Sequence, residues 1–169
     1  MATIDLLEYI DLPSTEGLNV ALGKGVDNCL TREKRDEAGL HTESDVDEEL
    51  LVILRFRVLV KVSSLSISGP AGSAPAALKL FCNPLSVDIS TAASDKPTQE
   101  IALSPAQVAP GAPPVPLRFV LFQKVSALGL FFPSAQDGGE KTALSRLAVH
   151  GTVVPNEGAA WAKDVEKSG

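Results

Sequence analysis

The sequence has 169 residues and a mass of 17.7 kDa; 44% of the residues are hydrophobic and 21% are charged, and the mean hydropathy is +0.14. This length fits one domain with a core that needs no disulfide or metal, and the composition excludes a chain that is disordered throughout. Fifteen basic against 21 acidic residues give a net charge of −6, which opposes nucleic-acid binding because a phosphate backbone requires clustered positive charge. No uncharged apolar run reaches the roughly 20 residues that span a bilayer, so we expect no membrane insertion and, without a basic and apolar start, no secretory signal.

The first fifty residues predict a short helix followed by a long polar arm. Apolar residues recur at helical spacing between Ile4 and Ile10, and Thr3 is available as an N-cap. Residues 14–49 are rich in Gly, Asn and charges. Because so long a loop is unusual inside a compact domain, we expect parts of this arm to be packed down or mobile.

From residue 50 onward the pattern indicates strands. A β-leaning run covers residues 50–56, and alternating apolar residues follow over 58–62; their phase then flips across Ser63 and Ser64, which predicts a bulge or bend there. A Gly-Pro-Ala-Gly turn at residues 69–72 precedes a strand over 78–82.

The second half adds further short strands. We expect them at residues 87–89, 99–103, 117–123, 127–132 and 143–150. Between them, Ser104, Pro105 and Gln107 have the spacing of a helix-capping box, which predicts a single turn or two of helix.

Together these elements predict an all-β, antiparallel sandwich or jelly roll. Parallel βαβ architecture is excluded because crossover helices are missing from the pattern. We expect the domain to cover residues 4–154 and residues 155–169, which contain Trp161, to form a frayed tail.

Catalytic and metal-binding motifs are scarce. His41 and His150 have no partner at metal-ligand spacing, and the sequence contains neither a nucleophile elbow nor a phosphate-binding loop. Cys29 and Cys82 are far apart, so we expect two free thiols in a reducing compartment, with Cys82 buried on a strand face and Cys29 possible as an exposed thiol. These features predict a protein that is not an enzyme and needs no cofactor.

The main polar cluster is the acidic stretch 43–49, which reads ESDVDEE. Three interpretations are open: a solvated loop in which an Asp or Ser caps a turn, a Ca²⁺ site, or a surface for a basic protein partner. The spacing does not match an EF-hand. Arg55, Arg57 and Lys61 in the following strand could also neutralise part of the stretch.

Several ordered strings resemble the PITH domain, a proteasome-interacting module that occurs at the C-terminus of a thioredoxin-like protein and in free-standing proteins. The strings are LLEYID at 6–11, GLN at 17–19, ESDVDEELL at 43–51, LSISGP at 65–70, LKLF at 78–81, LRFVLFQ at 117–123 and GT at 151–152. The resemblance departs from the family at Gly17, where many members have Cys, and at Arg55 and Arg57, which replace the more usual Pro and Asn.

This resemblance implies a jelly roll similar to galactose-binding-like domains, docking on the regulatory particle of the 26S proteasome, and a cytoplasmic or nuclear location. It supplies no catalytic residues, and the Cys-x-x-Cys motif of thioredoxin is absent from the sequence. We therefore expect a monomeric, non-catalytic adaptor. The alternative is a jelly-roll module that binds a small polar ligand, a carbohydrate or Ca²⁺.

As the partner-binding set we take Asp45, Asp47 and Glu48, together with Arg55 and Arg57. Loops at one end of a sandwich are suited to binding because the strands hold them rigid while their polar groups stay free.

Overall fold

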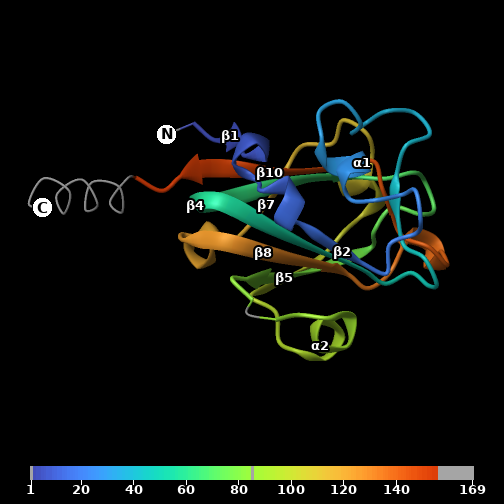
Figure 1. Cartoon of the computed structure of the whole chain (residues 1–169). Coiled ribbons are helices and arrows are strands. Elements are labelled where there is room, and N and C mark those ends of the chain that lie inside the picture. Colours follow the sequence, from blue (N-terminus) through green and yellow to red (C-terminus); the bar gives the residue numbers. More distant parts are fainter. Residues whose placement is uncertain (1, 85, 156–169) are drawn as a thin grey trace, which may run out of the picture.

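The computed structural model describes residues 2–84 and 86–155, which form one curled eight-stranded antiparallel sheet and a small two-stranded sheet, with short helical turns around them (Figure 1). All strand pairings in this part of the chain are antiparallel, as predicted. The order along the sheet is β1 (Ile4–Asp5), β10 (Arg146–Val153), β4 (Leu50–Ser68), β8 (Val125–Phe132), β5 (Ala77–Cys82) and β6 (Gln99–Ala102). No described helix is long and apolar enough to cross a membrane.

The 19-residue strand β4 connects the two layers of the sandwich. Its first half pairs with β2 (Glu16–Leu18) and β8, whereas its second half pairs with β10 and β7 (Val115–Pro116). Between Arg55 and Val60 the register with β8 shifts. The strand therefore bends there and passes from one layer to the other, at the left-hand end in Figure 1.

The predicted bulge at Ser63 and Ser64 is confirmed. His150 of β10 pairs with Ser64 and the next residue, Gly151, pairs with Val62, so Ser63 is the extra residue. Its hydroxyl donates to the His150 carbonyl over 3.2 Å. Gly151 is required at this point because a Cβ there would lie 1.8 Å from the carbonyl oxygen of Lys61.

Alternation along β4 builds two apolar clusters. Leu50, Val52 and Leu54 face the main core between the layers. The alternate residues Leu51 and Ile53 face outward. There they pack in a smaller cluster against Phe81 and Phe131, next to the short helix α2 (Ile89–Ser94), which lies below β5 in Figure 1.

Several predicted elements are confirmed. Strands occupy 99–102 and 125–132, Ala77–Cys82 covers the predicted strand at 78–82, and the predicted final strand is divided into β9 (Ala143–Leu144) and β10. The capping box at Ser104 forms with both of its hydrogen bonds and starts the 3₁₀ helix Pro105–Val108.

Three predicted elements are wrong. The helix expected at residues 4–10 is strand β1 followed by the 3₁₀ helix Leu7–Tyr9, because β1 gains hydrogen-bonding partners on β10 and Thr3 caps nothing. The strand expected at 87–89 instead leads into α2, since the Asp88 carboxylate caps the Thr91 amide. Residues 117–123 contain the 3₁₀ helix Phe119–Leu121 and no strand.

The polar arm is packed down. It contains β2, the one-turn helix α1 (Asp27–Leu30) and β3 (Thr42–Glu43), which pairs with β9. The buried side chains of Cys29 and Leu30 join the main core. The predicted tail beyond residue 155, including Trp161, lies outside the described residues.

Candidate interaction site

The acidic stretch 43–49 is a loop organised by one side chain of the arm, Asn19. The Asn19 amide nitrogen donates to Asp47 Oδ1 over 2.8 Å and to the Glu49 carbonyl over 2.6 Å, and its Oδ1 accepts from the Val46 amide over 3.2 Å. Asn19 has a φ of 59°, the left-handed region that Asn tolerates better than most residues. The loop shape therefore depends on a residue far away in the sequence.

Within this loop Asp47 has a structural role. Besides the bond from Asn19, its Oδ1 accepts the Glu49 amide over 3.0 Å. The interpretation of a carboxylate that caps a turn is thus confirmed for this residue. The neighbouring Ser44 is also structural, because its buried hydroxyl accepts the Thr142 amide over 2.9 Å.

Asp45 and Glu48 are differently placed. Asp45 is exposed and Glu48 half-buried, and neither side chain forms a hydrogen bond or ion pair with another described residue. Thr142 fixes the Glu48 backbone by donating to its carbonyl over 2.6 Å. Partial burial, followed by the charges of Asp47 and Glu48, raises the pKa of Glu49. The loop therefore holds a rigid, negatively charged surface, although no group of metal-ligating side chains lies together in the described part of the chain.

The two predicted arginines do not join the acidic loop. Arg55 pairs with Glu16 of β2 over 2.9 Å, and Arg57 is exposed at the bend of β4. With a rise of 3.3 Å per residue, that bend lies about 20 Å or more from the start of β4. No ion pair between described residues joins Arg55, Arg57 or Lys61 to the acidic loop. Lys24 instead neutralises part of the loop by pairing with Glu43 over 2.9 Å.

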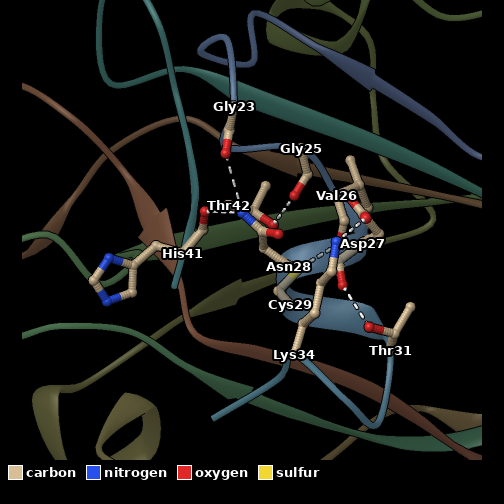
Figure 2. A network of polar contacts seen from close by, with 10 residues as sticks. All are labelled: Gly23, Gly25, Val26, Asp27, Asn28, Cys29, Thr31, Lys34, His41 and Thr42. Atoms are coloured by element: carbon tan, nitrogen blue, oxygen red, sulfur yellow. Dashed lines mark hydrogen bonds and ion pairs between the residues drawn. The ribbon is translucent and has the colours of Figure 1, made fainter. Parts of the chain in front are cut away.

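A network around α1 ties distant parts of the arm to one another (Figure 2). The buried Asn28 donates to the His41 carbonyl over 2.9 Å, and the Thr42 hydroxyl donates to the Gly25 carbonyl over 2.8 Å. At the exposed edge of this network, Lys34 forms an ion pair with Asp27, with 2.8 Å between Nζ and Oδ2. These hydrogen bonds join the two halves of the arm, and the folded arm covers one side of the main core through Cys29 and Leu30.

Cys29 lies in α1 and faces the main core. It is not the exposed thiol that the sequence allowed, because its side chain is fully buried, and burial raises its pKa to about 12. Cys82, which was expected to be buried on a strand face, is half-buried and packs against the main core, and burial also raises its pKa. Both thiols are free, and neither environment favours the thiolate that a reactive cysteine needs.

A second polar cluster surrounds the backbone pairing of Asp5 in β1 with His150 in β10. Arg35 pairs with Asp5 over 2.5 Å, and His150 Nε2 lies 2.9 Å from the Ser66 hydroxyl. Burial alone would raise the pKa of Asp5, but the hydrogen bonds from Arg35 and the Leu7 amide lower it overall. Burial lowers the pKa of His150. The cluster contains no activated nucleophile and has a structural role.

The bend of β4 and the adjacent 3₁₀ helix Phe119–Leu121 form an apolar surface that sequence reasoning missed. Its side chains are Val58, Leu59, Phe119, Val120 and Leu121, which are between 41% and 69% exposed. We call this set the bend patch. The missed signal is the string FVLF at 119–122, which shows no alternation and therefore does not fit a strand with one buried face.

Comparison with known proteins identifies relatives in sequence and in fold. Thioredoxin-like protein 1 of Schizosaccharomyces pombe is 37% identical over 128 residues, covering 73% of this chain and 44% of the relative. PITH domain-containing protein CG6153 of Drosophila melanogaster is 35% identical over 131 residues, covering 76% of this chain and 61% of the relative. The chain thus spans roughly half of the length of these curated relatives.

Among solved structures, the fold is similar to carbohydrate-binding proteins. A fucolectin from striped bass serum has a TM-score of 0.60 at 13% identity, covering 89% of this chain and 50% of that one. Two CBM32 domains of Clostridium perfringens ZmpB, solved with GalNAc, give 0.63 at 9% identity, covering 89% and 36%. These likenesses support the predicted jelly-roll sandwich. A family model described as the PITH domain matches residues 1–166, and the chain therefore belongs to the PITH domain family.

Proposed function

We propose that this protein is a non-catalytic adaptor that docks on the regulatory particle of the 26S proteasome in the cytoplasm or nucleus. The observation that carries the proposal is the family match over residues 1–166, which covers nearly the whole chain. Membership in this family implies a protein-interaction module. The buried, high-pKa Cys29 and the absence of a Cys-x-x-Cys motif from the sequence argue against redox chemistry in the domain itself.

The acidic loop supplies one contact in this proposal. Asp45 and Glu48 offer carboxylates to a basic patch of the partner, and Asn19 and Asp47 hold the loop in position. Because the loop is fixed before binding, little conformational entropy is lost when it docks. Exposed charge pairs contribute only about 0.2–1 kcal/mol each, so the loop mainly affects encounter rate and specificity.

Binding to purified proteasome particles tests the proposal. The tagged protein is incubated separately with 26S particles, isolated regulatory particles and isolated 20S core particles, and bound subunits are quantified. We expect capture of the first two and not of the core particle. Capture of none of them by the folded protein, or equal capture of the core particle, would refute proteasome docking.

A matched pair of variants tests the acidic contact. Asp45→Asn combined with Glu48→Gln removes the two charges while leaving Asp47 to hold the turn. Capture should weaken by about tenfold or less and become less dependent on salt, with an unchanged melting temperature. The control is Glu100→Gln, an exposed carboxylate on β6 away from the loop, which should bind as the wild type does.

A further inference from the structure

The bend patch lies in the middle of β4, at the opposite end of the domain from the acidic loop. Figure 1 shows the bend of β4, the start of β8 and the end of β10 at the left, whereas the chain enters β4 from the right. Phe119 and Val120 are 57% and 69% exposed, and Leu59 is 44% exposed. Large apolar side chains gathered in this way on a small domain are typical of contact surfaces.

Specific bonds hold the bend patch in place. The neighbouring Phe122 is fully buried, and its carbonyl accepts the Val62 amide of β4 over 3.0 Å. The Gln123 side chain donates to the Phe119 carbonyl over 2.7 Å and closes the 3₁₀ turn. The Leu59 carbonyl accepts the Val154 amide over 3.0 Å. The apolar side chains are therefore presented by a fixed backbone.

The segments that carry or adjoin the bend patch are positively charged, although the whole chain has a net charge of −6. These segments are residues 57–62, 115–126 and 151–155, and they contain Arg57, Lys61, Arg118 and Lys124 but no Asp or Glu. Glu8 and Glu33 line a surface pocket together with Arg57, so the unopposed positive charge lies at Arg118 and Lys124. Arg57, Arg118 and Lys124 are exposed. None of these four cations takes part in an ion pair between described residues.

We infer that the bend patch docks an acidic amphipathic segment of a protein partner, with apolar side chains on Phe119 and Val120 and carboxylates facing Arg118 and Lys124. This inference rests on the proposed role as a protein-interaction domain, but it concerns a second surface with the opposite charge. An apolar centre with a charged rim is the usual arrangement of a protein interface. The negative net charge disfavours the other possible occupant, an anionic lipid surface.

A probe peptide tests the inference without the proteasome. The probe is a fluorescein-labelled 16-residue peptide with Leu and Phe at i, i+3, i+4 and i+7 and Glu at the remaining positions. Its partner peptide has Lys in place of each Glu. Fluorescence anisotropy against the full chain should show at least tenfold tighter binding of the Glu peptide, with an affinity that falls as salt is raised.

Variants then locate the binding surface. Phe119→Ser combined with Val120→Ser should weaken binding of the Glu peptide at least tenfold, and Arg118→Gln combined with Lys124→Gln should weaken it severalfold and flatten its salt dependence. The matched control is Leu22→Ser, because Leu22 is an apolar side chain of the arm that is 102% exposed. It should bind as the wild type does, and all variants should keep the wild-type melting temperature.

Four results would overturn the inference. The first is equal binding of the Glu and Lys peptides, and the second is undiminished binding by the folded Phe119 and Val120 double variant. The third is binding to vesicles that contain phosphatidylserine without binding to the Glu peptide. The fourth is a concentration-dependent dimer that the same double variant dissociates, which would make a second copy the occupant. Peptide binding at the bend patch together with failed proteasome capture would refute only the proposed proteasome docking.

Discussion

Replacing Asn19 with Ala should destabilise the whole domain, although the side chain lies in a surface arm. The change removes three hydrogen bonds, to Asp47, to the Glu49 carbonyl and from the Val46 amide. At about 0.5–1.5 kcal/mol for each net bond, the loss is roughly 1.5–4.5 kcal/mol. Ala in the left-handed region adds about 1 kcal/mol. A decrease of about 4 kcal/mol in the free energy of unfolding is therefore expected.

Urea unfolding followed by circular dichroism measures this decrease directly, and the melting temperature should fall by about 2–4 °C per kcal/mol. Asn19→Gly separates the two contributions, because Gly adopts the left-handed conformation freely but forms none of the bonds. It should therefore be less destabilised than Asn19→Ala by about 1 kcal/mol. Asp45→Asn is the matched control in the same loop and should stay within about 0.5 kcal/mol of the wild type. If Asn19→Ala unfolds like this control, the loop is not organised by Asn19.

Three further predictions concern the bulge, the thiols and the half-buried His150. Gly151→Ala should cost about 3 kcal/mol or more in urea unfolding, because its Cβ would meet the Lys61 carbonyl oxygen at 1.8 Å; near-wild-type stability would contradict this packing. A thiol reagent should modify Cys82 in the folded protein but reach Cys29 only after denaturation, and rapid labelling of both would contradict the burial of Cys29. Because the pKa of His150 is lowered on folding, the unfolded state binds its proton more readily, so stability should fall as pH drops below about 6.5. His150→Gln should show a smaller loss of unfolding free energy between pH 7 and pH 5, and an equal loss would show that His150 does not contribute.

The sequence by itself determined the elements that depend on near neighbours. The capping box at Ser104 needs only Gln107 three residues away, and the strand at 125–132 follows from a dense apolar run. The bulge in β4 could also be predicted, since one extra residue flips the apolar phase of a strand whichever partner it pairs with. The ordered strings that resemble the PITH domain also predicted the jelly-roll fold and a protein-interaction role, because the resemblance implies both.

Only the tertiary structure decided the features that depend on distant partners. Residues 117–123 are apolar enough for a strand, but the buried Phe122 anchors a 3₁₀ turn that leaves Phe119 on the surface. Among the predicted site residues, Asp47 became structural through Asn19, which lies 28 residues earlier, whereas Asp45 kept an exposed carboxylate. The sequence pattern reports the local period of apolar and polar residues. This pattern does not show which polar side chains far apart in the sequence form a hydrogen bond, because the curvature of the sheet decides which of them come together.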